Sequence, residues 1–264
     1  MKTNTVSRVL LVGSLAFATS AAFAADLTAA QIAEKNAAAR GGLAAWRAVQ
    51  SISMSGEMDV GGKTDAKAPY TLNLKRPHKS RLEVRFENQP SVQTYDGVQG
   101  WKYRPFLGRT EAEALTEAEL KSEQATDELD GALIDAERKG TKIELQGMDK
   151  VEGKTAYKLR LAGAGGVSRN LWVDAASFLE VKIDGEPRKL DGHPHKVEVF
   201  FRDYKKVSGL NIPHTLETVV EGVKGSHKIV VKSVTVNPTL ADSLFGKPQP
   251  TAPAPAAAGK NPAP

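Results

Sequence analysis

The sequence predicts a mainly β protein of the α+β class: a curled, incompletely closed antiparallel β-barrel of about eleven strands, with helices plugging its concave side. Apolar and polar residues alternate in many short segments, as expected for strands buried on one face, and this pattern favours an antiparallel sheet. Turn residues, often glycine, separate the segments. So many antiparallel strands must close or be covered to hide their edges, and helical stretches are available for that purpose.

The first element of the mature chain is predicted to be a helix over residues 27–49. Thr28 is a suitable N-cap, and Gln31 completes the spacing of a capping box. The run Arg40-Gly41-Gly42 interrupts this helix. Apolar anchors follow its period at Ile32, Leu43, Trp46 and Val49.

The apolar period then changes from 3.6 to 2, which marks the first strand. One face of it is apolar, with Ile52, Met54, Met58 and Val60, and the other is polar, with Ser53, Ser55, Glu57 and Asp59. Further strands are expected at residues 70–74, 80–86, 92–95, 101–103, 142–147, 155–161, 169–173, 179–183, 196–204, 216–220 and 227–236.

A helical insertion of one or two pieces is expected in the middle of the chain. Residues 116–119 form a second capping box, and an acidic run continues to Arg138. Its apolar anchors are Leu120, Leu129, Leu133 and Ile134. We interpret this insertion as a surface helix that covers the sheet.

The two ends of the chain predict its location and its domain limits. Residues 1–24 resemble a cleavable signal peptide, with Lys2 and Arg8 before an apolar run and Ala22-Phe23-Ala24 at the cleavage site. We therefore expect export to the periplasm. Residues 247–264 hold six prolines and no aromatic residue, so we expect a disordered tail. Residues 25–246 are predicted to form one domain.

Composition excludes several classes of protein. The chain has no cysteine, so it forms no disulfide, no thiolate metal site and no cysteine nucleophile. Its formal charge is +5, and removal of Lys2 and Arg8 with the signal peptide leaves 5 − 2 = +3. That excess is dispersed and too weak to indicate a nucleic-acid partner. We expect a monomer.

Catalytic motifs are scarce in the sequence. It contains no G-x-S-x-G, H-E-x-x-H, P-loop or G-x-G-x-x-G pattern, and residues 163–166 are better explained as a hairpin turn than as a phosphate loop. His193 and His195, with Asp191, could form a weak metal site, but no third ligand stands at a diagnostic spacing. A polar loop is the favoured interpretation. We predict no enzyme, no metal and no cofactor. A hydrolase that uses these two histidines is the least favoured alternative.

Four segments occur in an order that is informative as a set. They are Tyr95-Asp-Gly-Val-Gln-Gly-Trp101, Leu171-Trp-Val-Asp174 with Leu179-Glu-Val-Lys182, Asp203-Tyr-Lys-Lys-Val-Ser-Gly-Leu-Asn-Ile-Pro213, and Val236-Asn-Pro-Thr-Leu-Ala-Asp-Ser-Leu-Phe245. Together they resemble the outer-membrane lipoprotein-sorting family, the LolA/LolB-like superfamily. The resemblance runs from about Ala29 to Phe245.

The resemblance implies a half-open barrel whose apolar interior, lidded by helices, receives the acyl chains of a lipid or lipoprotein. The chain would then be a periplasmic carrier that contributes to outer-membrane lipoprotein or lipid sorting, with inner- and outer-membrane envelope proteins as further partners. We expect the following residues to point inward and line the binding site: Met54, Met58, Leu72, Leu74, Leu82, Val84, Phe86, Trp101, Leu133 and Ile134. The alternative is a non-enzymatic envelope scaffold or protein-interaction module with a filled barrel.

Overall fold

The computed structural model describes residues 27–60, 66–86, 89–125, 129–163 and 168–249. The predicted signal peptide, residues 250–264 of the predicted tail and residues 164–166 of the predicted glycine turn lie outside the described residues. No helix among the described residues is both long enough and apolar enough to cross a membrane.

One large antiparallel sheet dominates the molecule. Its strands are β1 (Ser51–Asp59), β2 (Lys67–Lys75), β3 (Lys79–Phe86), β4 (Gln89–Tyr95), β5 (Gly100–Tyr103), β6 (Glu113–Ala114), β7 (Lys142–Val151), β8 (Lys154–Ala162), β9 (Ser168–Asp174), β10 (Glu180–Asp184), β13 (Val197–Val207), β14 (Leu210–Val220) and β15 (His227–Val236). They follow the order β6-β5-β4-β3-β2-β1-β15-β14-β13-β10-β9-β8-β7. The edges β6 and β7 do not pair with each other, so the predicted incomplete closure of the barrel is confirmed.

Turn residues define the hairpins as the sequence predicts. At the β4–β5 turn, Gly97 has φ +103° and the Asp96 carboxylate accepts hydrogen bonds from the backbone N–H groups of Val98 and Gln99. Positive φ is readily available to glycine because it has no Cβ. At the β13–β14 turn, Ser208 and Gly209 both take positive φ, as a tight hairpin turn requires.

The N-terminal helical segment is divided into α1 (Ala29–Ala39) and α2 (Leu43–Ala48). The capping box of Thr28 and Gln31 is confirmed. Gly41 and Gly42 have φ values of +114° and +101°, which no helix can continue through. A Cβ on Gly41 would lie 2.5 Å from the Gly209 carbonyl oxygen, so a side chain there is also excluded by the β13–β14 turn.

The described part of the mid-chain insertion contains one helix, α3 (Glu117–Ala125), which begins with the predicted capping box of Thr116 and Glu119. The expectation that helical anchors continue to residues 129–138 is wrong, because this stretch consists of turns and bends. Gly131 and Asp135 adopt positive φ there, which interrupts any regular helix. We call residues 129–141 the plug segment.

The described residues form fifteen strands, more than the eleven or twelve that we expect from the sequence. The polar loop predicted around His193 and His195 contains a short separate hairpin, β11 (Arg188–Leu190) and β12 (His193–His195). These segments and the two-residue β6 are too short and too polar to show alternation. Two 3-10 helices complete the fold, η1 (Pro105–Leu107) and η2 (Asp242–Phe245).

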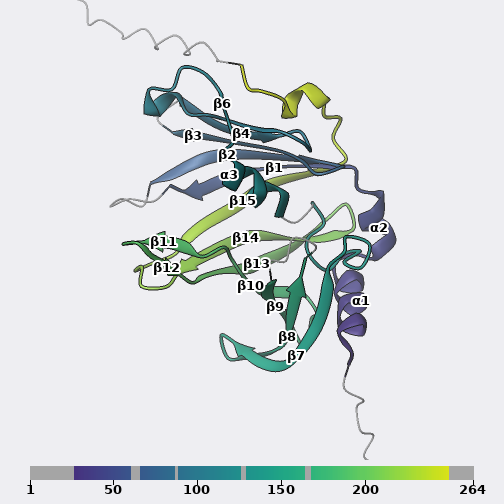
Figure 1. Ribbon diagram of the computed structural model, residues 1–264. Coiled ribbons are helices and arrows are strands. Elements are labelled where there is room, and N and C mark those ends of the chain that lie inside the picture. The colour runs from purple at the N-terminus through teal and green to yellow at the C-terminus, as the bar shows by residue number, and fades with distance from the viewer. Residues whose placement is uncertain (1–26, 61–65, 87–88, 126–128, 164–167, 250–264) are drawn as a thin grey trace, which may run out of the picture.

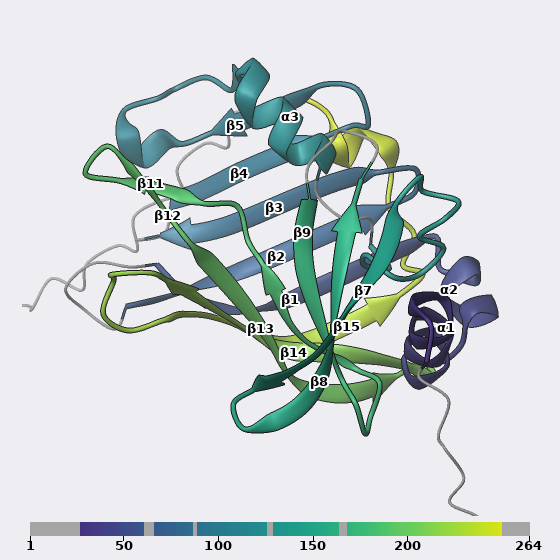
Figure 2. The same cartoon turned by 60° about the horizontal axis from the view of Figure 1, so that its bottom comes forward.

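The sheet is bent into a trough, and α3 lies on its concave side (Figure 1). At one end of the trough stand α1 and α2, and the β11–β12 hairpin stands at the other (Figure 2). Two core clusters fill the end near α1. One packs Ile32 of α1 and Leu133 of the plug segment against β8, β9 and β10, and the other packs Trp46 of α2 and Ile134 against β1 and β14. We call the sheet face that bears these clusters the concave face.

Candidate functional site

Apolar side chains continue across the concave face beyond the two core clusters. The register places Met54 beside Leu72 and Leu72 beside Leu82, on three neighbouring strands. One repeat further along these strands, Val84 lies beside Tyr70, so it belongs to the same face. We call the shared surface the apolar strip, and its members are Met54, Met58, Leu72, Leu82, Val84, Leu216 and Ile229.

The apolar strip is only half-buried, in contrast to the fully buried core clusters. Met58 joins its two halves, because it is in register with Ile229 of β15, which is in turn in register with Leu216 of β14. The predicted residues Leu74 and Phe86 share this face, at opposite ends of it. Leu74 lies beside Ile52 near α2, whereas Phe86, 39% exposed, ends β3 at the far end.

Two predicted lining residues belong to the core instead of the strip. Leu133 and Ile134 of the plug segment are 3% and 0% exposed, and each is part of a core cluster. They do point toward the concave face, as expected. Their side chains fill the trough near α1 and set the limit of the apolar strip at that end.

Trp101 does not lie with the other predicted residues. It is paired with Thr94, whose hydroxyl donates a 3.0 Å hydrogen bond to the Gly246 carbonyl oxygen on the outer face. Alternation therefore turns the Trp101 side chain outward. The strand that carries it has only four residues, too few for a sequence pattern to show which face is buried.

Polar contacts hold α3 over the concave face of β3, β4 and β5. The Glu123 carboxylate accepts hydrogen bonds from the Ser80 hydroxyl and from the Gln93 side chain, and the Glu119 carboxylate lies 2.6 Å from Lys102 Nζ. The Lys102 ammonium, together with the Thr116 backbone N–H, lowers the pKa of Glu119 to about 2. Charge and hydrogen bonds thus attach α3 to this part of the concave face.

A buried charged cluster anchors the plug segment. The Asp130 carboxylate, 1% exposed, lies 2.7 Å from Arg76 and also contacts the Lys139 ammonium. Arg40, at the end of α1, donates a 2.6 Å hydrogen bond to the Asp130 carbonyl oxygen and pairs with buried Glu180 at 3.5 Å. The sequence does not predict this cluster, because its members come from distant segments with no common spacing.

The histidine pair shows no metal-binding geometry. His193 is exposed, and His195 Nδ1 lies 2.9 Å from the Glu221 carbonyl oxygen. Within the described part of the chain, no group of three or more His, Asp or Glu side chains is arranged to hold a metal ion.

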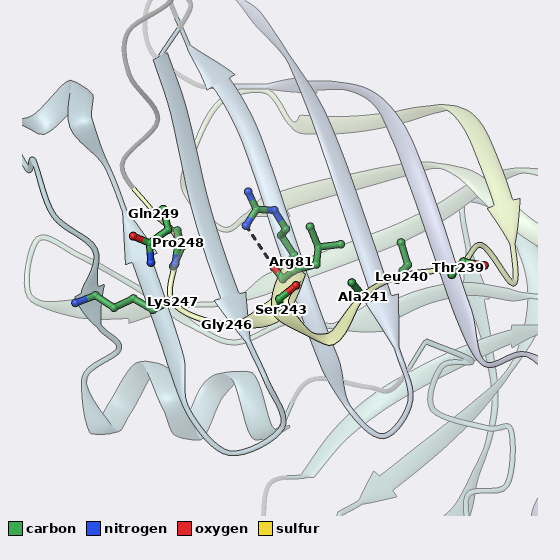
Figure 3. A pocket seen from close by; sticks show the side chains of 10 residues that line it. Arg81, Thr239, Leu240, Ala241, Ser243, Gly246, Lys247, Pro248 and Gln249 are labelled. Carbon is green, nitrogen blue, oxygen red and sulfur yellow. Dashed lines mark hydrogen bonds between the residues drawn. The ribbon is translucent and has the colours of Figure 1, made fainter.

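One hollow, about 400 Å³ in volume, lies away from the concave face. Figure 3 shows that it is formed by the C-terminal segment around η2 as this segment crosses β3. Arg81 reaches into it and donates a 3.4 Å hydrogen bond to the Leu244 carbonyl oxygen. Because most of its lining is one segment docked on the sheet, we interpret this hollow as a packing gap.

Comparison with solved structures identifies the architecture. A LolA superfamily protein from Nitrosomonas europaea matches with a TM-score of 0.55 at 15% identity, over 84% of this chain and 98% of that chain. This chain shares the fold of that protein. A putative outer membrane lipoprotein-sorting protein domain from Vibrio parahaemolyticus matches the same fold with a TM-score of 0.53 at 14% identity, over 82% and 95% of the two chains.

This chain also matches a DUF1329 family protein from Desulfovibrio piger, with a TM-score of 0.57 at 14% identity, over 83% of this chain and 98% of that chain. No protein-family model and no curated protein sequence matches the chain. The likeness to these solved structures is therefore a likeness of fold.

Proposed function

We propose that this protein is a non-enzymatic carrier of the periplasm that holds the acyl chains of a lipid or lipoprotein against the apolar strip, beneath α3. The observation that carries the proposal is the half-buried state of the strip. A sheet whose inner face served only as core would bury these side chains as fully as it buries Leu159 and Leu171. The fold shared with a LolA superfamily protein and with a protein domain named for lipoprotein sorting supports the same role.

The energetics suit reversible loading. Burying one CH₂ group stabilises a complex by about 0.8 kcal/mol, so an acyl chain with about fifteen of them gains about 12 kcal/mol. Removing the same acyl chain from a bilayer costs about the same amount, so the affinity of the carrier for the chain need only match that of the membrane. Met54 and Met58 suit this task because methionine adapts to irregular apolar partners.

We assign different tasks to α3 and to the plug segment in such a cycle. The plug segment is fastened by buried charges and by two core clusters, so it forms a permanent end wall. α3 is fastened by Glu119 and Glu123 to polar side chains of the concave face, so it is the element that can open above the strip.

The test is lipid binding by the purified protein. Organic extraction followed by mass spectrometry should release a lipid, and a lipophilic fluorophore should bind to the extracted protein. Replacing Leu82 and Val84 with asparagine should abolish fluorophore binding, because both side chains belong to the strip. The matched control is Val219→Asn, since Val219 is a half-buried strand valine on the outer face.

Absence of both extractable lipid and fluorophore binding would refute the carrier. The remaining explanation would then be an envelope scaffold that uses this architecture with a filled interior. Equal loss of binding in the Val219→Asn control would instead show that the Leu82 and Val84 replacements act through the stability of the sheet.

A further inference from the structure

A second hollow, of about 160 Å³, lies at the end of β5 beside η1. Lys102 and Glu113 line it from the β5–β6 ladder, where they are directly in register. Lys102 is also in register with Gln93, whose side chain contacts α3, so this part of the hollow opens on the concave side. Arg104, Leu107 and Arg109 complete the lining from the chain around η1.

The lining carries more positive than negative charge. Lys102 is neutralised by Glu119 at 2.6 Å, and Arg109 by Glu113 at 2.8 Å. Among the described residues, no carboxylate forms an ion pair with Arg104. One guanidinium therefore stays uncompensated beside a second one in a small recess, and guanidinium groups match the oxygens of phosphate with pairs of N–H donors.

Exposed apolar side chains connect this hollow to the apolar strip. Phe106 and Leu107 of η1 are 42% and 59% exposed, and the Phe106 ring centroid lies 6.4 Å from that of Phe86. From Phe86 the same face of β3 continues through Val84 to Leu82, a path of about 13 Å at the rise of a β-strand. Scattered exposed apolar residues are ordinary, but these form one chain from a basic recess to a half-buried apolar surface.

A basic recess joined to an apolar surface is complementary to an amphiphile that has an anionic group at one end and a hydrocarbon chain at the other. We propose that the cargo is a phosphate-bearing lipid, whose headgroup binds in the hollow of Lys102, Arg104 and Arg109 while its chains pass over Phe106 and Phe86 onto the strip. This assignment rests on the proposed function and specifies the class of lipid. The far end of the trough, opposite α1, is then the end at which the lipid headgroup stays in contact with water.

The experiment compares two short-chain lipids that differ only in the headgroup. Dioctanoyl phosphatidylglycerol and dioctanoylglycerol are titrated into the purified, lipid-extracted protein below their micellar concentrations, by calorimetry. The phosphate lipid should bind about tenfold more tightly, as expected for charge-assisted hydrogen bonds. The double variant Arg104→Gln/Arg109→Gln should remove this preference and leave the affinity for dioctanoylglycerol unchanged.

The matched control is Arg160→Gln. Arg160 is exposed on the outer face of β8 and, within the described ranges of the chain, forms no ion pair. It should leave both affinities unchanged; an equal loss in this control would show diffuse attraction and overturn the headgroup site. Inorganic phosphate is the third ligand. If inorganic phosphate displaced the phosphate lipid at concentrations similar to those at which the lipid binds, free phosphate would be the ligand and the assignment to a lipid would be overturned.

The two proposals fail in different ways. Equal affinity of the unmodified protein for the two lipids would overturn the phosphate headgroup and leave the acyl carrier intact. Binding of neither lipid would overturn the acyl carrier itself. Circular dichroism of each variant establishes that it retains the folded sheet before its affinity is interpreted.

Discussion

The two halves of the concave face have the same alternating pattern of side chains and different burial. Near α1, Leu159, Leu171 and Val173 are at most 1% exposed because α1 and the plug segment cover them. On β1–β3, Leu72 and Leu82 alternate in the same way, yet they stay half-buried and belong to neither of these two core clusters. An apolar sheet face thus becomes core or binding surface according to what covers it.

The largest effect should come from the charges that hold the plug segment. We expect Asp130→Ala to destabilise the protein by about 3–5 kcal/mol, because it leaves Arg76 and Lys139 without their buried counter-charge. Urea denaturation measures this loss. Asp242→Ala is the control: its exposed ion pairs with Lys75 and Lys79 should matter much less. Similar losses in both variants would contradict an anchoring role for Asp130.

A smaller effect, and a sharper test of the comparison, comes from truncating one leucine in each half. Leu159→Ala should cost about 2–5 kcal/mol because Leu159 is completely buried. Leu82→Ala should cost clearly less in the lipid-free protein, since Leu82 already contacts solvent. Denaturation curves with and without bound lipid test whether Leu82 contacts the lipid. Added lipid should raise the free energy of unfolding of the Leu82→Ala variant less than that of the unmodified protein. Equal costs without lipid would show that both halves are core.

The smallest effect concerns α3 and depends on pH. The folded pKa of Glu119 is about 2, below its ordinary value of 4.5, so its contribution is complete above about pH 4.5 and is lost as the pH falls toward 2. We expect α3 to detach over this range while the sheet persists. Because the chain has no cysteine, a single cysteine introduced at the exposed Glu117 can carry a fluorophore that reports the detachment.

Glu119→Gln is the control for the pH experiment. It removes the titrating group and the Lys102 ion pair together, so α3 should already be loosened at neutral pH, and the fluorescence change between pH 4.5 and 2 should be reduced. An unaltered fluorescence transition in this variant would show that another group controls α3.

Several local features could be predicted because they depend on residues close together in the chain. Both capping boxes and the Asp96-Gly97 turn follow from side chains within three residues of the backbone groups that they satisfy. The prediction that helical anchors continue from Leu129 onward is wrong, because the spacing of apolar residues is the same whether a helix or a turn buries them. Positive φ at Gly131 and Asp135 decided the outcome.

The sequence alone determined which residues share a face of each longer strand, since alternation is a property of the strand itself. It placed Met54, Met58, Leu72, Leu82 and Val84 on one face, and the register confirms that grouping. Only the tertiary structure decided how much of that face is covered, which way the short strand of Trp101 turns, and that Arg104 lines one hollow with Lys102 and Arg109. These properties arise from contacts between segments far apart in the chain, and no local spacing encodes them.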